Sequence, residues 1–217
     1  DVCSSDLQEV AKQTVKRTGA DIGLCFDGDA DRATIFDEDG EMIPPAIITT
    51  LVGQRLREQT DGPAVIAHNL PTSWVVADTL GDRDKVLTGG QTLITPVGYG
   101  KIKPLMFEMP EIAFGAEHSG HYMFRDFWCA DSGMMCAVIM LDLALKALKD
   151  GKAVSDLWKP LVRGYFNPGE FNFQLPRDVP ATDYITQAAD KHENEAKHIY
   201  VVSEGRVNDV DTYPPPG

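Results

Sequence analysis

Three carboxylates stand at alternate positions directly after a short apolar run, in the segment from Asp27 to Arg32 (DGDADR). Such spacing directs the oxygens of Asp27, Asp29 and Asp31 toward one centre, and hard oxygen ligands suit Mg²⁺ or Ca²⁺. Gly28 lets the loop fold back on itself. A guanidinium beside these carboxylates, that of Arg32, is suited to bind a phosphoryl oxygen bidentately. The loop therefore predicts a Mg²⁺ site coupled to phosphate chemistry.

The acidic loop alone also permits two other interpretations. A calcium loop of the helix-loop-helix kind needs a glycine at its sixth place and a glutamate at its twelfth, where this chain has Arg32 and Glu38. A solvated acidic turn between two strands is the third interpretation, because Asp and Gly are common turn residues. Arg32 favours metal and phosphate binding over the plain turn.

A second polar loop lies between Gly115 and His121 (GAEHSGH). Glu117 and Ser119, two residues apart, can project to the same side of an extended loop and bind neighbouring sugar hydroxyls. A histidine such as His121 can transfer protons near neutral pH. By itself the loop is equally consistent with a polar turn or an incomplete zinc site.

The residues around both loops predict the elements that position them. Apolar runs at 22–26 and 33–36 predict two strands on either side of the acidic loop. Helical spacing of apolar residues predicts helices at 7–17, 46–57, 73–80, 131–149 and 182–196. Further extended segments are expected at 64–67, 85–87, 92–96, 112–115, 170–175 and 199–203. This alternation of strands and helices predicts an α/β layer structure.

Composition excludes several classes of partner. The 33 acidic and 20 basic residues give a net charge of −13, which argues against a nucleic-acid-binding surface. No apolar run is long enough to span a bilayer, so we expect no membrane role. The four cysteines contain no CxxC pair, and we interpret them as reduced thiols of a cytoplasmic protein.

Taken together, the two loops resemble those of the α-D-phosphohexomutase family. DGDADR resembles the metal-binding motif of that family, and GAEHSGH resembles its sugar-recognition loop, whose core is Gly-Glu-x-Ser-Gly. The segment 95–99 (TPVGY) resembles a third family loop that lies between them. The stretch 118–133 is most similar to bacterial phosphomannomutases.

The resemblance implies mixed-sheet α/β domains of the phosphohexomutase type, one complete and flanked by partial ones. Residues 1–40 would end the metal-loop domain, 41–163 would form the sugar-recognition domain, and 164–217 would begin the phosphate-binding domain. The phosphoserine loop and the main phosphate-binding loop of the family are not recognised in this sequence. We therefore expect no turnover by this chain alone.

The resemblance also implies an activity: hexose 6-phosphate and hexose 1-phosphate are interconverted through a bisphosphate, with mannose phosphate expected as substrate. Mg²⁺ on the three aspartates would be the cofactor, and Arg32 would hold the transferring phosphoryl group. Glu117 and Ser119 would bind the sugar, and His121 would act in proton transfer or phosphate contact. The alternatives are a mutase that prefers glucose phosphate and a non-catalytic module that binds Mg²⁺ and sugar phosphate.

Three further substrate-binding residues are implied less directly. Gly98 and Tyr99 belong to the third loop, and Tyr99 stands where the family often has histidine. Trp74 lies near a position where the family often has a basic residue, and this is a second difference from the family pattern. Arg125, among aromatic residues, is expected to line the cleft, and the alternative is a core-facing aromatic cluster with Arg125 as a surface arginine. No oligomeric state is predicted.

Overall fold

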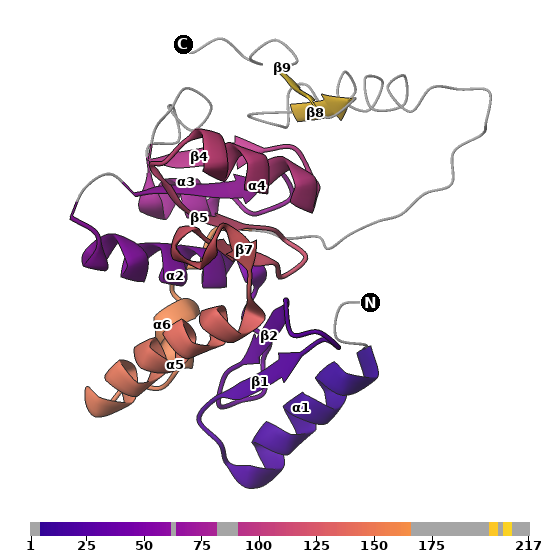
Figure 1. Ribbon diagram of the computed structural model, residues 1–217. Coiled ribbons are helices and arrows are strands. Elements are labelled where there is room, and N and C mark those ends of the chain that lie inside the picture. Colours follow the sequence, from indigo (N-terminus) through magenta and orange to yellow (C-terminus); the bar gives the residue numbers. More distant parts are fainter. Residues whose placement is uncertain (1–4, 62–63, 82–90, 166–199, 204–205, 210–217) are drawn as a thin grey trace. The chain divides into compact units, whose positions relative to one another are not determined.

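The computed structural model describes residues 5–61, 64–81, 91–165, 200–203 and 206–209. The chain divides into two units, Asp1–Phe166 and Asn167–Gly217; Figure 1 labels the helices and strands of the described residues. The elements expected at 85–87, 170–175 and 182–196 lie outside the described residues. The boundaries predicted at residues 40 and 163 stay predictions.

The first unit opens with a helix and a hairpin. Helix α1 (Ser5–Thr18) precedes strands β1 (Gly23–Phe26) and β2 (Ala33–Phe36), which pair antiparallel with Phe26 opposite Ala33. Val15 of α1 packs with Phe36 of β2 in a small buried cluster. The acidic loop is therefore the connection at the end of a hairpin, between the two strands that the sequence predicts.

The five-stranded sheet of this unit has the order β4-β3-β5-β6-β7. Its strands are β3 (Val65–Asn69), β4 (Thr92–Thr95), β5 (Ile112–Ala116), β6 (Tyr122–Phe124) and β7 (Ala130–Asp131). Strands β4, β3 and β5 run parallel, and β6 and β7 add antiparallel pairs, so the sheet is mixed. The predicted mixed-sheet α/β class is confirmed.

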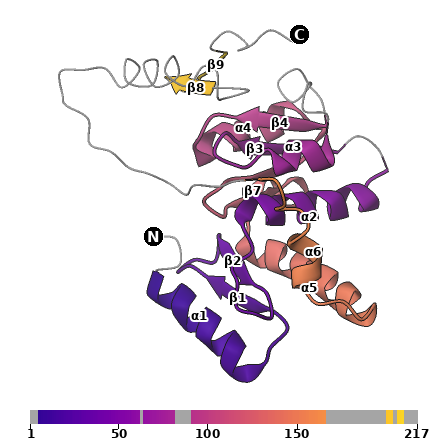
Figure 2. The same ribbon diagram turned by 180° about the vertical axis from the view of Figure 1, so that it is seen from behind.

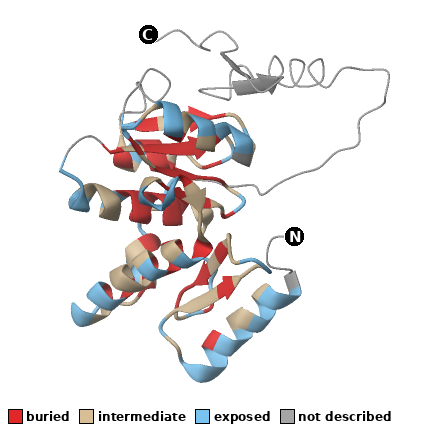
Figure 3. Ribbon diagram, viewed as in Figure 1, coloured by how far each residue is buried: buried red, intermediate tan, exposed pale blue. Residues whose placement is uncertain are grey.

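Helices cover both faces of this sheet (Figures 1 and 2). Residues of α2 (Pro45–Gln59), α3 (Val75–Leu80) and α5 (Gly133–Lys149) share one buried cluster with Ile66, Phe114 and Tyr122 of the sheet. On the opposite face, α4 (Tyr99–Glu108) packs Ile102 and Met106 against the strands. Buried residues accordingly concentrate in the strands and on the inner sides of the helices (Figure 3).

A short helix, α6 (Ser155–Trp158), hydrogen-bonds the segment that directly follows β2, at Asp37 and Glu38. Asp37 is fully buried, and its carboxylate accepts a hydrogen bond from Trp158 Nε1 at 3.2 Å. The Ser155 backbone N–H donates to the neighbouring Glu38 at 3.1 Å. Lys159 forms ion pairs with three acidic residues of this turn, which draw its pKa above the ordinary value mainly by accepting hydrogen bonds from it. These contacts fix the strand that leaves the acidic loop.

Two expectations about smaller features, the state of the cysteines and the strand at 199–203, can be compared with the structure. Cys129 and Cys136 are free and buried, but Cys25 is disulfide-bonded, so the interpretation of all four cysteines as reduced thiols is wrong at Cys25. Among the described residues, no helix is both long and apolar enough to cross a membrane. In the second unit, β8 (Tyr200–Ser203) and β9 (Arg206–Asp209) pair antiparallel, and β8 matches the strand expected at 199–203.

Candidate active site

The acidic loop gathers its carboxylates around a tight turn. Ala30 has a left-handed backbone (φ 60°), and its N–H donates to the Asp27 carbonyl at 3.2 Å. Carboxylate oxygens of Asp27, Asp29 and Asp31 all lie within 4.8 Å of one another. The structure therefore brings together the three residues predicted to hold the metal.

Charge within this loop supports a divalent cation. Burial raises the pKa of the Asp31 carboxyl; nearby His121 opposes this shift, while other carboxylates, led by Asp27 and Asp29, add to it. Asp31 Oδ1 is buried and makes no hydrogen bond to a described residue, although Arg32 Nε lies 3.5 Å away. A buried carboxylate oxygen without a hydrogen bond, beside two other carboxylates, fits a hard cation such as Mg²⁺.

Arg32 binds its own loop through only part of its guanidinium. Its Nε donates to Asp27 Oδ2 at 2.6 Å, and its backbone N–H donates to Asp27 Oδ1 at 3.2 Å. Burial alone would raise the pKa of the Asp27 carboxyl, but the hydrogen bonds and charge of Arg32 outweigh burial and lower it. Neither Nη atom of Arg32 hydrogen-bonds a described residue, so both can serve an anionic ligand.

The second loop meets the first through His121. Arg32 and His121 form an isolated antiparallel bridge between their backbones. The His121 ring places Nδ1 2.8 Å from Asp131 Oδ2 and 3.6 Å from Asp31 Oδ2. Because an ionised carboxylate can only accept, Nδ1 carries the proton in the shorter contact. The structure thus unites the predicted catalytic pair, Arg32 and His121, with a residue that sequence reasoning missed, Asp131.

The N-terminus of α5 packs closely against the acidic loop. The N–H of Gly133 donates to the Ala30 carbonyl at 3.1 Å. A Cβ on Gly133 would lie 2.5 Å from the backbone C and O of Arg32, so only glycine permits this approach. Ser132 caps the helix, because its side chain accepts from the Met135 N–H at 3.2 Å.

Glu117 lies at the carboxyl edge of the three parallel strands. It follows β5 and is 4 % exposed. Its Oε1 accepts from the Gly98 N–H at 3.1 Å and from Asn69 Nδ2 at 3.4 Å. Glu117 N also donates to the His121 carbonyl at 3.0 Å, so a single turn carries Glu117 at one end and His121 at the other. Ser119 lies exposed between them.

In the third loop, the structure describes the backbone of Gly98 and Tyr99. Gly98 has φ 122°, in the left-handed range that favours glycine, and directs its N–H at Glu117. Tyr99 begins α4, and its side chain is not among the described groups. Asn69 contacts the same carboxylate, but no sequence pattern singled it out.

Arg125 is not brought to this cluster. Its guanidinium donates to the carbonyls of Ile112 at 2.6 Å and Met109 at 2.8 Å, and to that of Met106. These carbonyls belong to the end of α4 and the start of β5, so the guanidinium joins these two elements. The sequence had instead indicated a position lining the cleft.

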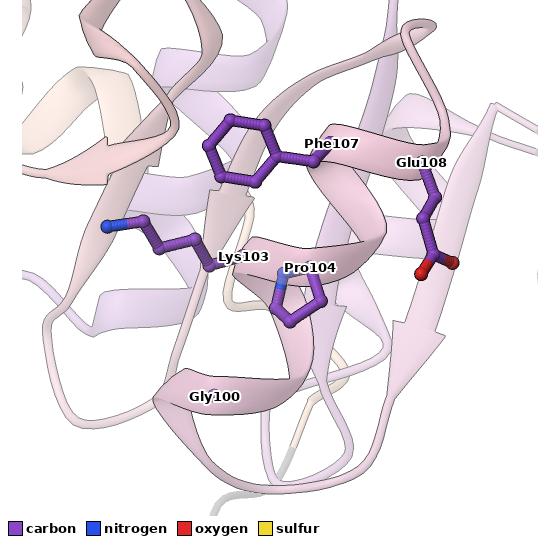
Figure 4. A pocket seen from close by; sticks show the side chains of 5 residues that line it. All are labelled: Gly100, Lys103, Pro104, Phe107 and Glu108. Atoms are coloured by element: carbon purple, nitrogen blue, oxygen red, sulfur yellow. The ribbon is translucent and has the colours of Figure 1, made fainter.

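An open hollow lies along the outer surface of α4 (Figure 4). Its lining residues are Gly100, Lys103, Pro104, Phe107 and Glu108. None of the predicted site residues belongs to this lining.

Comparison with known proteins identifies the family. The model of "Phosphoglucomutase/phosphomannomutase, alpha/beta/alpha domain III" matches residues 44–165. The chain belongs to this family. The predicted resemblance to phosphohexomutases is confirmed, since that match covers both the third loop and the sugar-recognition loop.

Individual members share sequence over most of the chain. A phosphomannomutase of Escherichia coli (strain K12) is 31 % identical over 182 residues, which are 84 % of this chain and 38 % of that protein. A phosphomannomutase of Methanocaldococcus jannaschii is 30 % identical over 186 residues, 85 % of this chain and 38 % of that protein. The chain therefore spans well under half the length of these curated relatives.

Solved structures share the fold. A phosphoglucomutase/phosphomannomutase family protein from Burkholderia thailandensis aligns with TM-score 0.66 at 24 % identity, covering 95 % of this chain and 41 % of the other. Parafusin from Paramecium aligns with TM-score 0.65 at 14 % identity, covering 94 % of this chain and 37 % of the other.

Proposed function

We propose that this chain supplies the metal-binding and sugar-recognition loops of a phosphohexomutase, which interconverts hexose 6-phosphate and hexose 1-phosphate through a bisphosphate. One observation carries the proposal: a single turn has Glu117 anchored at the sheet edge and His121 in contact with the acidic loop. A sugar bound at Glu117 would then present its phosphate to the acidic loop.

Each residue has a role that its surroundings permit. Asp27, Asp29 and Asp31 would hold Mg²⁺, which when bound supplies positive charge near the transferring phosphoryl group. The Nη atoms of Arg32 would bind phosphoryl oxygens, because its Nε is already engaged by Asp27. His121, oriented by Asp131, would move a proton at a sugar hydroxyl.

We assign sugar binding to the 117–121 turn and to the third loop, 95–99. Glu117 and the exposed Ser119 would bind sugar hydroxyls as acceptor and donor. Gly98 contributes through its backbone, and Tyr99 at the start of α4 is a candidate contact. Arg125 has no part in this proposal, because its guanidinium serves backbone carbonyls.

We expect mannose phosphate as the preferred substrate, because relatives that share most of this chain bear the name phosphomannomutase. A preference for glucose phosphate is the alternative. For the chain by itself we expect binding without turnover, since it spans 38 % of the length of such a relative.

Calorimetric titration with mannose 1-phosphate, with and without Mg²⁺, tests the proposal. Wild-type chain is expected to bind in a Mg²⁺-dependent manner. Asp29→Asn is expected to weaken Mg²⁺ binding, and Glu117→Gln to weaken sugar-phosphate binding while Mg²⁺ binding persists. Asp21→Asn is a matched control, because that exposed carboxylate lies outside the acidic loop.

The competing outcomes are distinct. Equal affinity for glucose 1-phosphate would remove the mannose preference but keep the mutase assignment. Absence of any hexose-phosphate binding by the wild-type chain with Mg²⁺ would contradict the proposal for this chain.

A further inference from the structure

We infer that Asn69 is the positioning residue for Glu117: its side-chain amide holds one carboxylate oxygen so that the other is presented to a sugar hydroxyl. The inference rests on the proposed function of Glu117 as a sugar ligand. Asn69 ends β3 and is 3 % exposed, and its Nδ2 lies 3.4 Å from Glu117 Oε1.

The orientation of the Asn69 amide follows from its other partners. Asn69 Oδ1 accepts from the His118 backbone N–H at 3.1 Å and from the Thr72 hydroxyl at 2.8 Å. A backbone N–H can only donate, so the atom facing it must be the amide oxygen. The amide nitrogen therefore faces Glu117, where it acts as a donor to the carboxylate.

Both donors to Glu117 act on the same oxygen. The Gly98 N–H and Asn69 Nδ2 reach Oε1, whereas Oε2 accepts no hydrogen bond from any described residue. A carboxylate that is only 4 % exposed needs such donors to offset its lost hydration. With Oε1 engaged, the side chain is held in one orientation, and Oε2 remains as the acceptor for a ligand hydroxyl.

Asn69 also holds the 117–121 turn at two points. Through Oδ1 it holds the start of the 117–121 turn, and through Nδ2 it holds the carboxylate that the turn carries. This arrangement requires a group that both accepts and donates at one position. An aspartate there would keep the acceptor and replace the donor with a second carboxylate facing Glu117.

The isosteric substitution Asn69→Asp separates these two functions. His118 and Thr72 keep their acceptor, but repulsion between two carboxylates displaces Glu117. We expect affinity for mannose 1-phosphate, measured with saturating Mg²⁺ at pH 8, to fall by at least about tenfold, since the loss of one hydrogen bond to a charged group is of this size. The affinity of Asn69→Ala is expected to fall by at least the same factor.

Thr72→Val provides the matched control. It removes one bond to Asn69 Oδ1 but leaves the His118 N–H and the amide contact with Glu117, so we expect affinity within about twofold of wild type. Melting temperatures verify that each variant is folded.

Two readouts distinguish positioning from a general loss of structure. The affinity of Asn69→Asp is divided by that of wild type at the same pH. This ratio should rise as the pH falls from 8 to about 5.5, because the two adjacent carboxylates then share a proton, and that proton restores a hydrogen-bond donor between them. Amide hydrogen exchange at Gly98 should quicken in Asn69→Asp while exchange at His118 does not.

The exchange measurement needs no ligand, so it separates this inference from the proposed function. If wild type fails to bind mannose 1-phosphate, the proposed function fails for this chain, and faster exchange at Gly98 in Asn69→Asp still supports the anchoring. Unchanged exchange at Gly98 in both Asn69 variants would overturn the inference. So would wild-type affinity in Asn69→Asp at pH 8.

Discussion

His68 is a fully buried histidine in β3, one residue before Asn69. Burial lowers the pKa of its imidazole to about 4, and the contact with the Asn69 carbonyl only partly opposes that shift. Its Nε2 has no hydrogen-bond partner within the described part of the chain. The folded chain therefore holds His68 neutral, and charging it would place an unpaired cation under the edge of the sheet that carries Glu117.

The pH dependence of stability follows from this burial. The ordinary pKa is 6.5 and the folded one about 4, so between these values the native state binds fewer protons than the unfolded state. The stabilisation is complete above pH 6.5 and is lost as the pH falls toward 4. This single group should lower the free energy of unfolding by about 3 kcal/mol across that window.

Urea denaturation at pH 7.5 and pH 4.5 measures the effect. His68→Gln removes the titrating group but keeps a polar side chain, so its loss of stability between the two pH values should be smaller than that of wild type. Equal losses in both proteins would mean that other groups account for the acid sensitivity.

At the scale of elements, much of the chain could be predicted from residue patterns. The helices α1, α2 and α5 follow from long apolar periodicities, and β1 and β2 from short apolar runs on either side of the acidic loop. Helix α4 was missed because Pro104 lies inside it and Gly98 precedes it, and both residues usually mark helix ends. Strands β6 and β7 were missed because runs of three and two residues carry no alternation.

The candidate site was predictable only in part, for a related reason. Asp27, Asp29 and Asp31 are close in sequence, so their spacing alone indicates shared ligation. Asn69 and Asp131 gain their roles by meeting partners 48 and 10 residues away. Only the packing of β3 beside β5, and of β7 beside β6, creates those contacts.

Arg125 tests how one side chain joins two elements. Arg125→Met keeps the aliphatic stem but leaves the carbonyls of Ile112 and Met109 without their donor. We expect the free energy of unfolding to fall by about 3 kcal/mol, because two part-buried carbonyls lose a charged donor. Mannose 1-phosphate affinity should stay near the wild-type value. Lower affinity with unchanged stability in denaturant titrations would instead restore Arg125 as a cleft residue.

Gly133 tests the contact between α5 and the acidic loop. In Gly133→Ala the new Cβ meets the Arg32 backbone at 2.5 Å, and backbone yields little, so stability should fall by about 1–3 kcal/mol. Mg²⁺ affinity should fall with it, because the shift reaches the loop that holds the aspartates.

Gly100→Ala is the comparison, since a Cβ there meets nothing within 4 Å and lies inside α4. Its stability should rise by up to about 1 kcal/mol through helix propensity. Isothermal denaturation measures the stability of both variants, and Mg²⁺ titration measures their affinity for the metal. A neutral effect of Gly133→Ala would show that the helix and loop do not constrain one another.

At the scale of the whole molecule, the net charge of −13 gives folding an electrostatic cost that a bound cation relieves. The acidic loop concentrates part of this charge, with the pKa of Asp31 raised by burial and by neighbouring carboxylates. A cation that binds the native loop must stabilise the fold, because the unfolded chain does not hold these carboxylates together.

We therefore expect Mg²⁺ to raise the melting temperature in a saturable manner. At a free concentration 100 times its Kd, Mg²⁺ should add about 2.7 kcal/mol to the free energy of unfolding, or roughly 5–10 °C in a calorimetric scan. NaCl at matched ionic strength controls for screening, which affects the whole charge distribution and does not saturate at one site.

Asp29→Asn should lose the Mg²⁺-dependent increase without losing the fold, because Asp29 is exposed and makes no hydrogen bond to a described residue. Stabilisation by Ca²⁺ at far lower concentration than Mg²⁺ would favour a calcium loop. An equal response of wild type and Asp29→Asn would place the cation outside this loop, and the phosphate chemistry assigned to the loop would lose its support.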